Sequence, residues 1–117
     1  MLVDDEAMIR DVARRMLEKS GFSVITAADG FAAIEMFKQH RDQIRLVLLD
    51  MTMPRMDGES CLRELRQLDP GVRVILTSGF NEQDIAGRFV GEGPAGFVQK
   101  PFTSGELLPK IRESLGE

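Results

Sequence analysis

A short apolar run that ends at a carboxylate and passes directly into a loop sets the expected architecture of this chain. The run covers residues 46–49 (LVLL), Asp50 follows it, and Pro54 and Gly58 come shortly afterwards. An apolar run without polar alternation predicts a strand buried on both faces, as in a parallel sheet covered by helices. Proline lacks an N–H and glycine tolerates positive φ, so both favour a loop here. Asp50 is therefore expected at the carboxyl end of a central strand, where open α/β sheets bind ligands.

The rest of the chain alternates strand-length apolar runs with amphipathic helical patterns. Strands are expected at residues 1–3, 22–27, 44–50, 72–77 and 96–99, and helices at residues 6–20, 31–40, 59–68, 82–90 and from 104 to about 115. Short connections between alternating strands and helices require parallel strands and right-handed crossovers. We therefore expect an α/β fold: a flavodoxin-like, doubly wound sheet of five parallel strands in a three-layer α/β/α sandwich. The fourth helix should be the least stable, because each interior glycine costs roughly 0.5–1 kcal/mol relative to alanine.

Local signals predict where two helices begin and end. Gly21 is expected to end the first helix, and Ser104 to cap the last one. Pro109 is expected within or just after the first turn of that last helix, where proline is best tolerated. In the first helix, Met8 and Val12 belong to an apolar stripe that is expected to form its inner face.

The size of the chain and its ionisable residues exclude several classes of protein. A length of 117 residues suits one core, so residues 1–117 are expected to form a single domain whose first strand, short beside the others, is truncated. A net charge of −4 argues against non-specific binding to nucleic acid, and no apolar run is long enough to span a membrane. The single Cys61 excludes an internal disulfide and favours a reducing, cytoplasmic location. His40 is the only histidine, which excludes a multi-histidine metal site.

Polar side chains fall where four of the predicted strands end. Asp4 and Asp5 follow the first strand, Asp50 the third, Ser78 the fourth and Lys100 the fifth. Because parallel strands place their carboxyl ends at one edge of the sheet, these side chains are expected to gather there. Three carboxylates repel one another unless a cation or a proton intervenes, and oxygen ligands of this kind suit Mg²⁺, which shares its coordination shell with phosphate. The sequence therefore predicts a magnesium and phosphoryl site.

Each member of this set has a chemical role and a plain structural alternative. Asp50 is the candidate nucleophile, because carboxylates form acyl phosphates. Lys100 offers a cation to a phosphoryl oxygen, and Ser78 offers a hydrogen-bond donor. Taken singly, the acidic pair after the first strand also fits a helix N-terminus, and the other residues fit ordinary turns and strand ends. Their coincidence at one edge of the sheet favours the functional interpretation.

The motifs, taken in order, resemble the receiver domain of response regulators, the phosphoacceptor half of two-component signalling. The matching segments are residues 2–6 (LVDDE), 49–50 (LD), 53–54 (MP), 56–58 (MDG), 76–79 (LTSG) and 96–102 (GFVQKPF). They cover essentially the full chain. The resemblance implies the strand order 2-1-3-4-5, which is known for chemotaxis regulators of this family. The segment after the fourth strand and the last motif look like those of receivers attached to hybrid histidine kinases.

The resemblance also implies how the site works. Asp50 would take a phosphoryl group from a phosphohistidine on a partner, either a histidine kinase or a histidine phosphotransfer protein. Mg²⁺ would be bound by Asp5, Asp50 and the backbone carbonyl of Thr52, while Asp4 would act through a metal-bound water. The resemblance also allows a homodimer through the fourth and fifth helices but does not require one. No contact of the domain with nucleic acid or a membrane is expected.

The same resemblance implies a switch. Ser78 and Lys100 would hold the phosphoryl oxygens, and the Lys100–Pro101 peptide bond would be cis. Phosphorylation would draw Ser78 inward, and Phe97, at the position of the family's switch aromatic, would fill the space. Serine stands here where threonine is more frequent, and phenylalanine where many members have tyrosine, so the aromatic ring lacks a hydroxyl.

Two other functions are weighed against this one. An aspartate-based, Mg²⁺-dependent phosphohydrolase would use Asp50 on a small substrate, but that class typically has a second acid two residues after its nucleophile, where this chain has Thr52. A receiver-like interaction module that no longer accepts phosphate is disfavoured by the intact set of Asp5, Asp50, Ser78 and Lys100. On the preferred interpretation the protein is no enzyme, since it would catalyse only its own phosphorylation and dephosphorylation.

Overall fold

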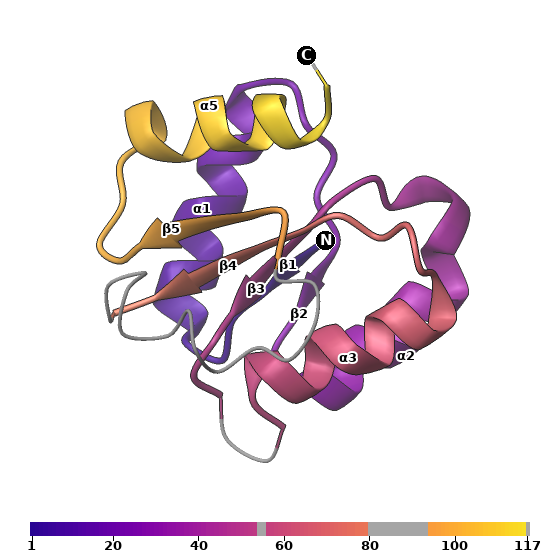
Figure 1. Cartoon of the computed structure of the whole chain (residues 1–117). Coiled ribbons are helices and arrows are strands. Elements are labelled where there is room, and N and C mark those ends of the chain that lie inside the picture. Colours follow the sequence, from indigo (N-terminus) through magenta and orange to yellow (C-terminus); the bar gives the residue numbers. More distant parts are fainter. Residues whose placement is uncertain (54–55, 80–93, 117) are drawn as a thin grey trace.

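A five-stranded parallel sheet forms the centre of the molecule (Figure 1). The computed structural model describes residues 1–53, 56–79 and 94–116. The strands are β1 (Leu2–Val3), β2 (Thr26–Ala27), β3 (Val47–Asp50), β4 (Val74–Ser78) and β5 (Gly96–Gln99). They pair in the order β2-β1-β3-β4-β5, and all neighbours are parallel. The predicted α/β fold and its strand order are therefore confirmed.

Helices cover both faces of the sheet. They are α1 (Ala7–Lys19), α2 (Gly30–His40), α3 (Gly58–Leu68) and α5 (Ser104–Ser114), with a short 3₁₀ helix, η1 (Arg41–Gln43), after α2. Helices α1 and α5 lie on one face, and α2 and α3 lie on the other (Figure 1). The helix predicted over residues 82–90 lies outside the described residues. No helix in the described part of the chain is long and apolar enough to cross a membrane.

Burial on both faces explains why the central strands lack polar alternation. All residues of β3 and β4 are buried. Successive side chains of a strand point to opposite faces. Accordingly, Leu48 and Ile75 pack in the cluster under α1 and α5, whereas Leu49 and Leu76 pack in the cluster under α2 and α3. The double covering thus buries β3 over its whole length, and Asp50 is its last residue.

Side-chain caps and one glycine define several helix ends. Asp29 precedes α2, and its carboxylate accepts a hydrogen bond from the N–H of Ala32 at 2.8 Å. Asp57 caps α3 in the same way through the N–H of Ser60. Gly21 has φ +96°, a left-handed conformation that suits glycine, and it ends α1 as predicted.

Three predicted strand boundaries are wrong, because pairing partners limit the strands. Residues 22–25 are not part of β2, which pairs with β1 through Thr26 and Ala27 alone. The strand predicted over residues 44–50 begins only at Val47, which pairs with the first residue of β4. The fourth strand was predicted over residues 72–77, but β4 is Val74–Ser78, so Ser78 belongs to the strand. Apolar content alone therefore predicts strands that begin earlier along the chain than the hydrogen-bonded pairing does.

Two predictions for the last helix are also wrong. Thr103, not Ser104, is the N-cap of α5, and its hydroxyl donates to the carboxylate of Glu106 at 3.1 Å instead of capping a backbone N–H. Pro109 lies in the middle of α5 instead of near its first turn. Proline has no N–H, so the helical hydrogen bond to the carbonyl of Gly105 is absent. The apolar residues Leu107 and Ile111 nevertheless hold α5 on the sheet.

The inner face of α1 differs from the predicted one. Met8 and Val12, expected to face the core, are 80% and 55% exposed. Ala13 and Leu17 are buried instead and pack in the cluster with α5. The helix has apolar residues on a wider arc than the sheet covers, so one edge of that arc remains at the surface.

Candidate functional site

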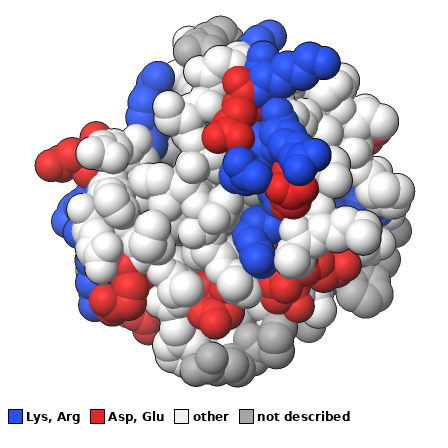
Figure 2. All heavy atoms as spheres, turned by 180° about the vertical axis from the view of Figure 1, so that it is seen from behind, with Lys and Arg blue, Asp and Glu red and all other residues white. Residues whose placement is uncertain are grey.

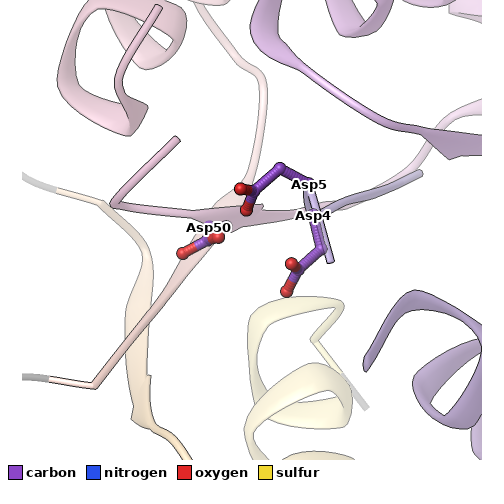
Figure 3. Close-up of side chains that lie close together, drawn as sticks. All are labelled: Asp4, Asp5 and Asp50. Carbon is purple, nitrogen blue, oxygen red and sulfur yellow. The ribbon is translucent and has the colours of Figure 1, made fainter. Parts of the chain in front are cut away.

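Three carboxylates meet at the carboxyl edge of the sheet (Figure 3). Asp4 and Asp5 directly follow β1, and Asp50 is the last residue of the neighbouring strand β3. Val3 pairs with Leu49, so the next residue of each strand brings Asp4 and Asp50 alongside one another. One oxygen from each carboxylate lies within 4.8 Å of the others. Asp4 and Asp50 are buried, whereas Asp5 is exposed, so the cluster opens to the surface on the side of Asp5.

Lys100 brings a cation to this cluster from the far side of β4. It follows β5, and its backbone N–H donates to the carbonyl of Ser78 at 2.7 Å. Its Nζ lies 2.8 Å from Oδ2 of Asp4 and 3.4 Å from Oδ2 of Asp50. The Lys100–Pro101 peptide bond is cis. One ammonium among three carboxylates leaves the cluster with an excess of negative charge.

Hydrogen bonds hold the two buried carboxylates in place. Oδ1 of Asp4 accepts the backbone N–H of Glu6 at 2.9 Å, while its Oδ2 accepts Lys100. Oδ1 of Asp50 accepts the backbone N–H of Thr52 at 3.2 Å. Both oxygens of Asp4 therefore have protein donors, whereas Asp5 presents its carboxylate at the open side of the cluster.

Burial and charge alter the acidity of the central carboxylate. Burial raises the pKa of Asp50 to about 7; the nearby carboxylates of Asp4 and Asp5 add to this rise, and Lys100 and the N–H of Thr52 oppose it. Burial by itself lowers the pKa of Lys100, but its contacts with Asp4 and Asp50 raise it above the ordinary value. A further cation would favour the ionised form of Asp50. The donor set, three carboxylates in excess over one ammonium, therefore fits a small divalent metal ion.

The other predicted residues divide between the site and the core. Ser78 is the last residue of β4 and is completely buried. Asp50 pairs with Thr77, the residue before Ser78, so the structure brings Ser78 to the edge of the sheet where the carboxylates meet. Thr52 is exposed beside Asp50. Phe97 is 9% exposed and packs in the cluster under α2 and α3, so it lies in the core and not among the carboxylates.

The loop after Asp50 approaches the strand too closely for any side chain at Gly58. The N–H of Gly58 donates to the carbonyl of Met51 at 2.9 Å. A Cβ at Gly58 would lie 2.7 Å from the carbonyl oxygen of Asp50 and 2.7 Å from Cα of Met51. Real Cβ atoms essentially never come this close, so this glycine is required where α3 begins against the end of β3.

A groove of about 820 Å³ extends from the carboxylates along α1. At one end it is lined by polar groups of the site, including Asp50 and Lys100, and along its length by apolar residues of α1 and of the segment after β5, among them Met8, Val12 and Phe102. This groove was not predicted from the sequence, because the whole apolar arc of α1 was assigned to the core. The arc is wider than one buried helix face needs, and this width was the signal that part of it stays at the surface.

The rear surface of the molecule carries charges of both signs. On the face shown in Figure 2, Lys and Arg side chains lie next to Asp and Glu side chains. On α1, Arg14 pairs with Asp11 and Glu18, and Arg15 also pairs with Asp11. Surface pairs of this type contribute little stability, roughly 0.2–1 kcal/mol each. Interleaved charges on this face do not form the continuous basic surface that nucleic-acid binding favours.

The sequence matches a known protein family over almost its whole length. The family model for the response regulator receiver domain matches residues 1–112. The chemotaxis protein CheY of Bacillus subtilis is 35% identical over 116 residues, which cover 98% of this chain and 95% of that protein. The sensor kinase CckA of Brucella abortus is 35% identical over 115 residues, but the matched part covers 98% of this chain and only 12% of the kinase.

Solved structures show the same relationship. A receiver domain protein from Clostridium thermocellum matches with a TM-score of 0.90 and 30% identity, covering 98% of this chain and 91% of that chain. A chain in the CheX–CheY–BeF₃–Mg²⁺ complex from Borrelia burgdorferi matches with a TM-score of 0.87 and 33% identity, covering 96% of this chain and 84% of that chain.

Proposed function

This chain belongs to the response regulator receiver domain family, the phosphoacceptors of two-component signalling, and we propose that Asp50 is the residue that accepts the phosphoryl group. The observation that carries the assignment is the place of Asp50 at the end of the central strand β3. There its carboxylate lies 3.4 Å from the Lys100 ammonium and within 4.8 Å of two other carboxylates. In α/β sheets this edge is the place where ligands bind.

The phosphoryl donor would be a phosphohistidine on a histidine kinase or a histidine phosphotransfer protein. A carboxylate oxygen of Asp50 attacks the phosphorus, a new O–P bond forms, and the N–P bond breaks with its electron pair returning to the imidazole ring. The product is an acyl phosphate. Asp50 has to be ionised for this attack, and the charge of Lys100 favours the ionised form by lowering the pKa of Asp50.

We assign the metal ligands to residues at the open side of the cluster. Asp5, Asp50 and the backbone carbonyl of Thr52 would bind Mg²⁺ directly, and Asp4 would act through a metal-bound water. This division is supported by the engagement of both Asp4 oxygens with protein donors and by the exposure of Asp5. A bound Mg²⁺ would neutralise charge on the transferring group.

Lys100 and Ser78 would then hold the phosphoryl oxygens. Lys100 is already 3.4 Å from Asp50, so a small movement away from Asp4 brings its ammonium to a phosphoryl group on Asp50. Ser78 ends the adjacent strand β4 and offers a hydroxyl. Movement of Ser78 toward the phosphoryl group would open space for Phe97, which packs one strand further on, and so change an interaction surface.

The groove beside α1 is the proposed approach for the phosphohistidine partner. It opens directly onto Asp50 and Lys100, and its apolar wall includes the exposed side chains of Met8 and Val12. An exposed apolar wall next to a reactive centre favours the docking of a protein surface. A partner seated there would present its imidazole to Asp50.

The phosphohydrolase alternative is not favoured by the site. Thr52 is the second residue after Asp50, and it offers no acid to protonate a leaving group.

We propose that the domain acts as a signalling phosphoacceptor that catalyses only its own phosphorylation and dephosphorylation. The buried free thiol of Cys61 fits a reducing, cytoplasmic location.

Intact mass after incubation with Mg²⁺ and acetyl phosphate tests the assignment. The wild-type protein should gain a single labile adduct of about 80 Da, the mass of one phosphoryl group on a carboxylate. Asp50→Asn should gain none. Asp57→Asn is the matched control and should still gain the adduct, because Asp57 is a carboxylate in the same loop but serves as the N-cap of α3. An adduct that persists in Asp50→Asn would overturn the assignment.

A further inference from the structure

The side chain of Arg10 turns back from α1 to the end of β1. Its Nη1 donates to the backbone carbonyl oxygen of Asp4 at 2.7 Å, in a partly buried position. The backbone N–H of Arg10 donates to the carbonyl of Glu6 at 2.9 Å, so the residue is anchored in the first turn of the helix. A guanidinium donor makes this a charge-assisted hydrogen bond, which is stronger than a neutral one.

This contact restrains the peptide unit between the two acidic residues. The carbonyl of Asp4 and the N–H of Asp5 belong to one planar peptide group. Holding that carbonyl oxygen therefore fixes the plane of the peptide, and with it the direction in which the Asp5 side chain leaves the backbone. Figure 3 shows the carboxylate of Asp5 directed toward Asp50.

Asp4 and Asp5 differ in how their carboxylates are held. The side chain of Asp4 is fixed by Glu6 N–H and by Lys100, independently of Arg10. Asp5 is exposed, and its carboxylate interacts with that of Asp50, so its position depends on Asp50 and on the backbone that carries it. A change that releases the Asp4 carbonyl should therefore affect Asp5 more than Asp4.

We propose that Arg10 is a positioning residue for the metal site, which holds the Asp4–Asp5 peptide so that the Asp5 carboxylate faces Asp50. The inference rests on the proposed function, since it concerns Mg²⁺ binding at these carboxylates. Other arginines of α1 do not share the role: Arg14 and Arg15 pair with side chains of the same helix at the surface.

Titration of the unphosphorylated protein with Mg²⁺, followed by calorimetry, tests the proposal directly. Arg10→Met keeps an apolar stem and removes the donor, and it should raise the Kd for Mg²⁺ about tenfold, as loss of a residue that supports a metal ligand typically does. Arg10→Lys keeps a charged donor and should recover part of the affinity. The matched control, Arg14→Met, should stay within about twofold of the wild type, since Arg14 makes only surface pairs.

The outcomes separate this inference from the proposed function. If the wild type binds no Mg²⁺, the proposed metal site itself is wrong, and the inference falls with it. If the wild type binds and Arg10→Met binds equally well, or if Arg14→Met loses as much affinity, the inference alone is overturned. Thermal melting shows whether each variant is folded. Should Arg10→Met not fold, Arg10→Ala decides, because this variant also lacks a side-chain donor and wild-type affinity in it would contradict the proposed role.

Discussion

Replacement of Gly58 by alanine should destabilise the protein through a single methyl group. That methyl would lie 2.7 Å from the carbonyl oxygen of Asp50, 2.7 Å from Cα of Met51 and 3.2 Å from the carbonyl oxygen of Met51. All three are backbone atoms of the end of β3 and the loop, so no side chain can rotate away to make room. Overpacking of this kind costs typically about 1–3 kcal/mol, and the rigid neighbours place Gly58→Ala near the upper end.

Helix propensity offsets part of this loss. Gly58 is the first residue of α3, where alanine is favoured over glycine by at most about 1 kcal/mol. The net loss is therefore about 2 kcal/mol. With an unfolding entropy of about 2.1 cal/mol/K per residue, a chain of 117 residues loses about 4 °C of Tm per kcal/mol, so Tm should fall by about 8 °C.

Thermal unfolding followed by circular dichroism measures this effect, with Gly105→Ala as the matched control. A Cβ at Gly105 would have Thr103 Oγ1 as its nearest neighbour at 3.7 Å, an ordinary contact, so the control should keep or raise Tm. Gly58→Ala should also slow phosphorylation by acetyl phosphate, because the strain falls on the backbone of Asp50. A Tm for Gly58→Ala within about 1 °C of the wild type would refute the steric reasoning, since that equals only a quarter of a kcal/mol.

Three further predictions concern Asp50, the groove beside α1 and the buried thiol of Cys61. In EDTA, the free energy of unfolding should fall as pH rises from about 4 to about 7, because the pKa of Asp50 is raised to about 7 in the folded state while the unfolded carboxyl ionises at lower pH. Thermal melting of Asp50→Asn should lack this pH dependence, and an equal dependence in the variant would contradict the prediction. Met8→Ser with Val12→Ser should slow phosphotransfer from the histidine partner at least several-fold while acetyl phosphate still labels the protein; equal loss with both donors would point to damage at the site instead of lost docking. Burial raises the pKa of the Cys61 thiol to about 12, so a disulfide reagent at pH 8 should label the native protein far more slowly than the unfolded protein, and rapid native labelling would show that α3 opens.

Sequence reasoning found the carboxylate cluster because parallel topology needs only the ends of strands. Asp50 follows an unbroken apolar run, and Asp4 and Lys100 follow two other short strands, so any parallel sheet built from these strands brings the three residues to one edge. The distances of 2.8 Å and 3.4 Å from Lys100 bear out that gathering. The order of the strands came from a family resemblance, not from the residues themselves, and the structure confirms it.

The same reasoning failed where a residue's role depends on its neighbour in space. Ser104 has a good capping side chain, but Thr103 takes the N-cap, and local residue types did not distinguish the two. Met8 and Val12 have apolar side chains at helical spacing, yet they line an open groove. Arg10 belongs to a helix with several arginines, and its sequence position alone did not indicate that it reaches back to the carbonyl of Asp4.

The amino-acid sequence by itself determined the α/β class, the double covering of β3 and the set of side chains at the carboxyl edge of the sheet. These depend on hydrophobic period and on where apolar runs stop, which are properties of the linear chain. Only the tertiary structure decided which part of the apolar arc of α1 stays exposed, how close Gly58 comes to the end of β3, and that Arg10 holds the Asp4 carbonyl. Those features depend on how the helices and the loop pack onto the sheet, and packing distances are not encoded in periodicity.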